Sequence, residues 1–157
     1  MITVKDTDRT ISFTGKLLAS STSYTPGKSR WIEFKLYHTE TGDYLLSRLG
    51  ATLVFHSAFC DTVRRNCIDP LPSNVLAKNM VPCEKCRPQL EYEEFVYPEV
   101  PRHWAQSTPT AEGVLSFLVK YDEFDSPYYT TVARNLITDA AKNDDELRDI
   151  YYNTKLT

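Results

Sequence analysis

Glycine is scarce in this chain, with five among 157 residues, and no glycine-rich loop that could cradle a phosphate is present. The sequence also lacks a nucleophile elbow and a His-Glu-x2-His helix. No apolar run approaches the roughly 20 residues that a membrane helix needs, and the first residues lack the apolar core of a signal peptide. These absences disfavour nucleotide loops and common hydrolase sites, and they predict a cytoplasmic protein without a membrane partner.

An excess of basic charge is also missing, because the formal net charge is −3. Residues 1–105 hold 13 Lys and Arg against 12 Asp and Glu, whereas residues 106–157 hold 5 against 9. A protein that coats nucleic acid is therefore disfavoured, and any surface for nucleic acid has to be local. With 41% hydrophobic and 25% charged residues, the composition is that of a globular chain about one domain long.

The first half of the chain carries strand patterns. Residues 31–37 alternate apolar and charged side chains, and residues 44–49 follow a short glycine-containing connection, as the return strand of a hairpin would. Residues 51–55 predict a further strand that ends at His56, and residues 61–81 predict an irregular loop with one turn of helix near residues 74–78. We therefore expect an antiparallel β-meander in this half.

The last third carries helix patterns. Apolar side chains recur at steps of three and one from Tyr129 to Ala141, and Ser126-Pro127 predicts the start of that helix. Prolines predict a linker over residues 98–108. The predicted fold is α+β, with a β-meander and zinc knuckle in residues 1–97, the linker, and a helical segment in residues 109–157.

Two pairs of residues of the types that bind metal ions lie between the strand patterns and the helix patterns. The first pair is His56-x3-Cys60, and the second lies in Pro82-Cys83-Glu84-Lys85-Cys86-Arg87-Pro88. A Cys-x2-Cys turn presents two thiolates to one cation, and the other pair completes a tetrahedral site. We predict that His56, Cys60, Cys83 and Cys86 bind one structural Zn²⁺ as a cofactor. The alternative is an all-cysteine site in which Cys67 replaces His56.

This run of 33 residues among 157 resembles the small zinc-binding N-terminal domain of the Ada DNA-alkylation-repair protein. The pattern of that domain is Cys-x3-Cys, a gap in the twenties, and Pro-Cys-x2-Cys-x-Pro. The chain also resembles bacterial and phage proteins in which a Trp-led strand and a Tyr-rich hairpin, here residues 31–50, precede the same knuckle. The resemblance implies a zinc-binding fold.

The chain departs from the Ada pattern at the residue that matters for repair. In Ada-type domains the first cysteine accepts a methyl group from a DNA phosphotriester, and His56 stands at that position here. A zinc-bound imidazole lacks the nucleophilicity of a zinc-bound thiolate. The rest of the chain resembles neither the helix-turn-helix nor the second methyl-acceptor domain of that family, so the resemblance does not imply DNA repair.

The expected function is a non-enzymatic, zinc-stabilised protein-interaction module of a bacterial or phage adaptor or anti-defence type, whose partner is another protein. The tyrosine pairs at residues 128–129 and 151–152 of the acidic tail suit such a surface, whereas a place in the helical core is the better expectation for Tyr129 and Tyr151. The alternative is an accessory protein that binds nucleic acid through the local basic patch of Arg64, Arg65, Lys85 and Arg87. A third hypothesis is a small enzyme whose site combines residues distant in sequence. The sequence specifies no oligomeric state.

Overall fold

The computed structural model describes residues 1–88 and 93–153. It contains helices and mostly antiparallel sheets, so the predicted α+β class is confirmed. The chain divides into two compact units, and each draws on separate stretches of sequence. Unit 1 comprises Met1–Ser23, Ile32–Leu49 and the described residues from Arg102 onward, whereas unit 2 comprises Tyr24–Trp31 and Gly50–Pro101.

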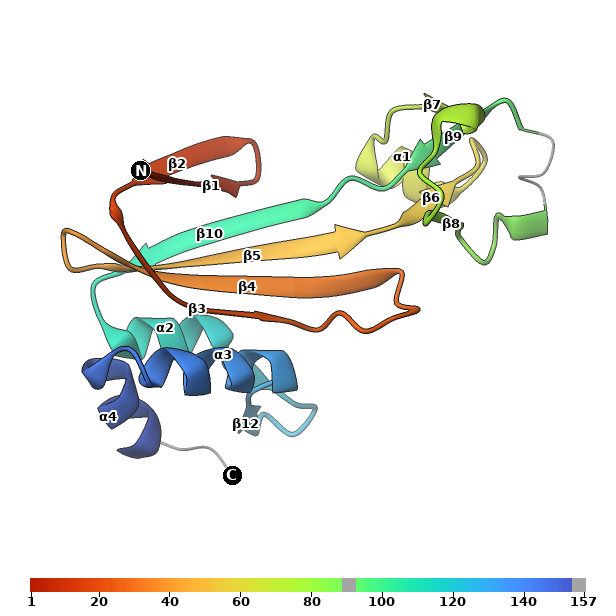
Figure 1. Ribbon diagram of the computed structural model, residues 1–157. Helices are drawn as coiled ribbons and strands as arrows, with labels where there is room; N and C mark the ends of the chain where they lie inside the picture. The colour runs from red at the N-terminus through yellow and green to blue at the C-terminus, as the bar shows by residue number, and fades with distance from the viewer. Residues whose placement is uncertain (89–92, 154–157) are drawn as a thin grey trace. The chain divides into compact units, whose positions relative to one another are not determined.

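A four-stranded sheet in the order β10-β5-β4-β3 is the centre of unit 1 (Figure 1). Its strands are β3 (Gly15–Thr22), β4 (Arg30–Thr39), β5 (Tyr44–Thr52) and β10 (Arg102–Thr108). A separate antiparallel hairpin precedes it, formed by β1 (Ile2–Asp6) and β2 (Arg9–Phe13). Gly42, at φ 92°, lies in the turn between β4 and β5, a backbone conformation that glycine adopts without strain.

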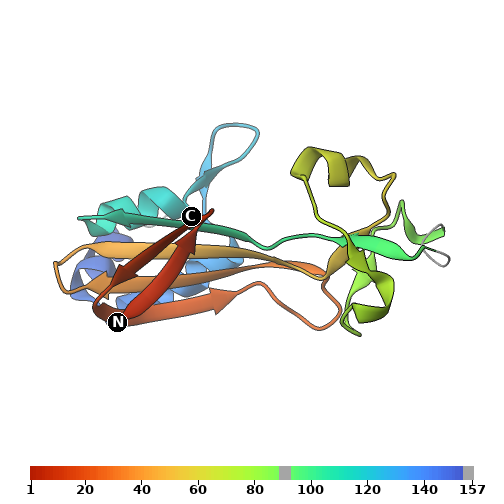
Figure 2. The same cartoon turned by 90° about the horizontal axis from the view of Figure 1, so that it is seen from above.

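Both faces of this sheet bury apolar side chains, because neighbouring residues of a strand point to opposite faces. Phe34 and Leu36 of β4 join the core formed with helices α2 (Ala111–Leu118), α3 (Thr131–Ala141) and α4 (Asp145–Asn153). Tyr37 lies in a second cluster with Val4 of the β1–β2 hairpin. Figures 1 and 2 show the helices on one face of the sheet and the hairpin across the other.

The segment expected to be a proline-containing linker, residues 98–108, is instead largely a strand. Residues Arg102–Thr108 form β10, which lies beside β5 in the central sheet. Proline is compatible with this arrangement because Pro98 and Pro101 precede the strand and Pro109 follows it. The division of the chain at residues 97 and 109 is therefore corrected, since unit 1 takes residues from both sides of unit 2.

The predicted helices occur within residues 109–153, but one of them starts later than expected. Pro127–Tyr128 forms β12, which pairs antiparallel with β11 (Lys120–Tyr121). Helix α3 begins at Thr131 instead, and Thr130 is its N-cap. The predicted apolar stripe is confirmed within α3, because Ala133, Leu136 and Ile137 are buried in the core.

Unit 2 contains short strands and turns. Its sheet has the order β7-β9-β6-β8, with β6 (Val54–His56), β7 (Leu71–Pro72), β8 (Val81–Pro82) and β9 (Phe95–Pro98). The helical turn expected near residues 74–78 is a 3-10 turn at Ser73–Val75, and residues 61–81 are more regular than expected because they also include helix α1 (Asp61–Asn66). Among the described residues of the whole chain, no helix is long and apolar enough to cross a membrane.

Candidate metal centre

Strands β6 and β8 bring the two ligand pairs together. They are parallel neighbours, with Val54 opposite Val81 and Phe55 opposite Pro82. The Cys83 amide donates a hydrogen bond to the Phe55 carbonyl at 2.9 Å, so the second pair begins beside the residue that precedes His56. Residues 27 positions apart in the sequence thereby become neighbours.

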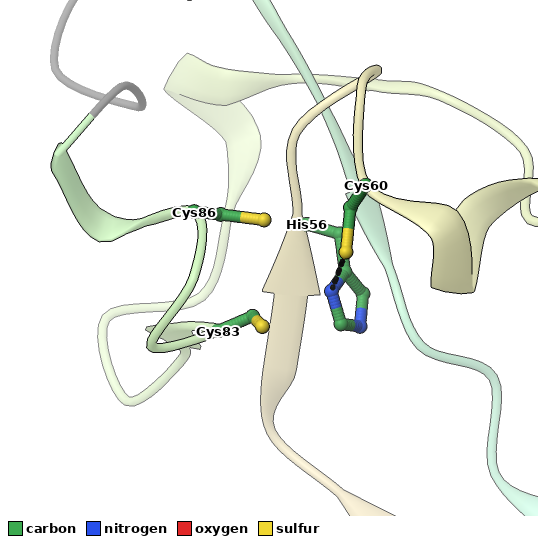
Figure 3. Close-up of side chains that lie close together, drawn as sticks. All are labelled: His56, Cys60, Cys83 and Cys86. Atoms are coloured by element: carbon green, nitrogen blue, oxygen red, sulfur yellow. Dashed lines mark hydrogen bonds between the residues drawn. The ribbon is translucent and has the colours of Figure 1, made fainter.

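His56, Cys60, Cys83 and Cys86 form one cluster, and their ligand atoms all lie within 4.8 Å of one another. Figure 3 shows the three sulfur atoms and one edge of the imidazole turned toward a common point. The Cys60 Sγ lies 3.4 Å from His56 Nδ1, which identifies Nδ1 as the ring nitrogen that faces the thiols. Ligand atoms on a tetrahedral zinc lie about 3.5–3.8 Å apart, given Zn–N and Zn–S bonds of about 2.0–2.3 Å. The cluster is thus a possible metal site.

Tight turns hold the two pairs of candidate ligands. The amides of Cys86 and Arg87 both donate to the Cys83 carbonyl, at 2.9 and 3.0 Å, which closes the Cys-x2-Cys turn. The Cys60 amide donates to the Ser57 carbonyl at 3.2 Å, and Cys60 is the N-cap of helix α1. Local sequence alone therefore positions each sulfur relative to its own partner.

Hydrogen bonds to sulfur affect the acidity of two thiols. Burial opposes ionisation of Cys60, but hydrogen bonds from the amide and hydroxyl of Thr62 outweigh it and lower the pKa of Cys60 to about 7. Burial raises the pKa of the Cys86 thiol against hydrogen bonds from Ser57. Cys60 is the more acidic of the two, and a metal ion would displace the remaining protons because thiolates are the ligands.

Glu99 lies behind His56, on the side away from the thiols. Its Oε1 is 2.7 Å from His56 Nε2, and the His56 side chain is 1% exposed. The Thr52 hydroxyl donates to Glu99 Oε2 at 2.7 Å, and Arg30 Nε donates to the same oxygen at 3.1 Å. Burial favours the neutral acid, but the bonds from Arg30, Thr52 and His56 prevail and lower the pKa of Glu99 to about 2.

Sequence reasoning missed Arg30, Thr52 and Glu99. Arg30 lies 69 residues from Glu99 in the sequence, and Glu99 lies 43 residues from His56. None of the three stands at a motif spacing from a ligand, so only the arrangement of the strands reveals them. Arg30 is also close enough to Cys83 for its charge to interact with that thiol, which makes it a cation that balances the sulfur-rich cluster.

The other predicted site residues lie outside the cluster. Cys67 is exposed, in a left-handed conformation (φ 49°) at the end of α1, so the all-cysteine alternative does not match the observed grouping. Arg64, Arg65, Lys85 and Arg87 are all exposed in unit 2. Arg64 forms an ion pair with Asp61 at 2.9 Å, so the Asp61 carboxylate offsets one of the two arginine charges of α1.

Comparisons of the chain with protein-family models, with curated proteins and with solved structures found no match.

Proposed function

We propose that this protein is a zinc-stabilised protein-interaction module without catalytic activity of its own, of the adaptor or anti-defence type that bacteria and phages use. The observation that carries the zinc assignment is the cluster of one imidazole nitrogen and three sulfurs within 4.8 Å. Three thiolates and one imidazole suit Zn²⁺, and four protein ligands fill its tetrahedral shell. Such a shell leaves no position for an activated water, so the role of the metal is to hold unit 2 together.

The composition of unit 2 supports a structural role for the metal. Its apolar side chains that are buried in the described part of the chain are few: Val54, Phe55, Val63, Ile68, Cys86 and Val96. A unit of this size with a small core needs a further source of stability, which a structural metal supplies. The resemblance to the Ada-type zinc domain, carried by the same residues, points to the same role.

Metal analysis tests this proposal directly. The purified protein should contain one zinc per chain, and replacement by Co²⁺ should give the intense visible bands of a tetrahedral thiolate site. Protein that folds without any metal, or a cobalt spectrum typical of six-coordinate oxygen ligands, would contradict the proposal.

The interaction role is supported by exposed aromatic side chains on the β11–β12 hairpin, residues 120–128. Tyr121, Phe124 and Tyr128 are 62%, 80% and 42% exposed. The loop is ordered by Asp122, whose Oδ1 accepts bonds from the amides of Phe124 and Ser126 at 2.8 and 2.9 Å. Aromatic side chains are enriched at protein interfaces, and an ordered loop loses little entropy when it binds.

Site-specific photocrosslinking tests the interaction role. A crosslinker in place of Phe124 should capture a discrete protein partner in bacterial cells, and a crosslinker at the exposed Val100, which lies outside the hairpin, is the control. Identical patterns at both positions would contradict a role for the hairpin.

The second candidate function is nucleic-acid binding through Arg64, Arg65, Lys85 and Arg87. The observation in its favour is that all four side chains are exposed in one unit. Fluorescence anisotropy with a labelled oligonucleotide should then show binding that weakens as salt rises, and reversal of the four charges should abolish it. Absence of binding at low salt would exclude this candidate.

A further inference from the structure

We propose that Glu99 is a positioning residue of the metal centre, which holds His56 in the tautomer that presents Nδ1 to the metal. This inference rests on the proposed zinc function, and it extends the centre beyond its four ligands. It assigns roles to Arg30 and Thr52 as well, since both bind the Glu99 carboxylate.

The contact between His56 and Glu99 defines the tautomer. An ionised carboxylate accepts hydrogen bonds and cannot donate them, so the 2.7 Å contact requires a proton on His56 Nε2. A neutral imidazole carries one ring proton, and Nδ1 therefore keeps its lone pair. This lone pair faces the sulfur atoms, because Nδ1 lies 3.4 Å from the Cys60 Sγ.

The Glu99 carboxylate is itself held in place. Its Oε2 accepts from both Thr52 and Arg30, and the Glu99 amide donates to the Val54 carbonyl at 2.9 Å. Thr52 Oγ1 in turn accepts from the Val54 amide at 3.1 Å, which fixes the hydroxyl. The acceptor for Nε2 is thus set by the backbone of β5, β6 and the residue after β9, and little rotation remains for the imidazole.

The charges are consistent with this role. A Zn²⁺ ion with three thiolates and a neutral imidazole carries a charge of −1, and an ionised Glu99 would add another negative charge. Arg30 offsets that charge through contacts with both carboxylate oxygens. Glu99 can therefore strengthen the basicity of His56 without making the centre more negative as a whole.

Substitution of Glu99→Gln tests the inference, with Glu94→Gln as the matched control. Glu94 is exposed, and the bond from Ser73 that it accepts goes to its backbone carbonyl, so the control removes one charge from unit 2 without touching the centre. Removal of such an outer partner commonly weakens metal binding 10–100-fold. Competition with a chromophoric chelator should show a loss of zinc affinity of about tenfold or more in Glu99→Gln and none in Glu94→Gln.

Nitrogen NMR of the unaltered, zinc-loaded protein supplies a readout that does not depend on a variant. The chain has three histidines, so ¹⁵N-histidine labelling gives a simple spectrum. We expect His56 to show a protonated Nε2 and a metal-bound Nδ1, with slow exchange of the Nε2 proton. In Glu99→Gln that proton should exchange faster.

Thr52→Val and Thr52→Ser separate the hydroxyl from the shape of the side chain. Thr52→Ser retains the donor to Glu99 and should keep the zinc affinity, whereas Thr52→Val should reduce it. Zinc bound through Nε2, or equal affinity in Glu99→Gln and the unaltered protein, would overturn this inference and leave the zinc proposal intact. Failure of the unaltered protein to bind zinc would overturn both.

Discussion

At the scale of single residues, the clustered cysteines differ from Cys67 in their surroundings and not in their chemistry. Cys83 lies in the cluster, half-buried, whereas Cys67 is exposed and lies outside it. Both are thiols in unit 2. The pair therefore provides a test of the metal centre in which one variant serves as the control for the other.

Cys83→Ser should release the metal and lower the free energy of unfolding of unit 2 by several kcal/mol, because structural zinc contributes directly to folding. Cys67→Ser should keep one zinc per chain and change stability by less than about 0.5 kcal/mol, as expected for an exposed position. Metal analysis and urea unfolding check both variants. Equal metal loss in the two would place Cys67 in the centre and contradict the grouping seen here.

Tyr44 shows how one buried polar group joins the sheet of unit 1 to a helix. The side chain is 1% exposed, and its hydroxyl donates to Asp144 Oδ2 at 2.7 Å and to Glu146 Oε2 at 3.0 Å. Burial and these two carboxylates raise the pKa of Tyr44 well above its usual value. The folded protein therefore holds a proton that the unfolded chain releases.

The stability that Tyr44 contributes should be fully present below pH ~10, the usual pKa of tyrosine, and should fall as the pH rises above it. The phenolate absorbance of the unaltered protein and of Tyr44→Phe should be measured against pH. The difference between the two curves should show no ionisation of Tyr44 until the protein unfolds. The exposed Tyr128, treated in the same way with Tyr128→Phe, is the control. Ionisation of Tyr44 near pH 10 in the folded protein would contradict the raised pKa.

At the scale of elements, threonine caps determine where two helices begin. Thr110 Oγ1 accepts from the Gly113 amide at 3.1 Å at the start of α2, and Thr130 Oγ1 accepts from the Ala133 amide at 3.3 Å at the start of α3. Each satisfies an amide that has no partner within its helix. For α3 the cap replaces the expected start at Ser126-Pro127, because both of those residues belong to the β11–β12 hairpin.

Thr130→Ala should destabilise unit 1 by about 1 kcal/mol through loss of the cap. Thr131→Ala is the control, since Thr131 is exposed at the first helical position and alanine is the better helix former there. Urea unfolding followed by circular dichroism measures both. Equal stability of the two variants would mean that the hydroxyl of Thr130 contributes nothing.

At the scale of the whole molecule, the two units differ in what stabilises them. The core of unit 1 combines one face of the sheet with α2, α3 and α4, and all of its residues belong to unit 1. The described residues of unit 2 include few buried apolar side chains, and the candidate ligands lie within this unit. Metal removal should therefore affect the units unequally.

A strong zinc chelator should increase hydrogen exchange in β6, β8 and α1, while the amides of α2 and α3 keep their protection. The physical reason is that zinc binding supplies folding energy only to the unit that holds the ligands. Mass spectrometry of peptides from both units measures this in a single experiment. A uniform rise in exchange through both units would contradict their separate stabilisation.

The sequence by itself determined those features that depend on neighbouring residues. The Cys-x2-Cys turn and the His-x3-Cys pair gave the four clustered residues, and the apolar stripe from Tyr129 to Ala141 gave α3, because a helix face repeats every three or four residues. The alternation of apolar and charged side chains around Phe34 predicted a strand, because neighbouring residues of a strand point to opposite faces of the sheet. The sequence did not show whether the prolines of residues 98–108 lie in a linker or flank a strand, because proline is compatible with both.

The tertiary structure alone decided which distant residues meet. β10 joins the sheet beside β5, although residues 53–101 separate them, and no local pattern encodes that pairing. Glu99, Arg30 and Thr52 gather behind His56 for the same reason, because strand neighbours bring together side chains that are remote in sequence. Local spacing thus sets the four candidate ligands, whereas the arrangement of β4, β5, β6 and β9 sets the groups that surround His56.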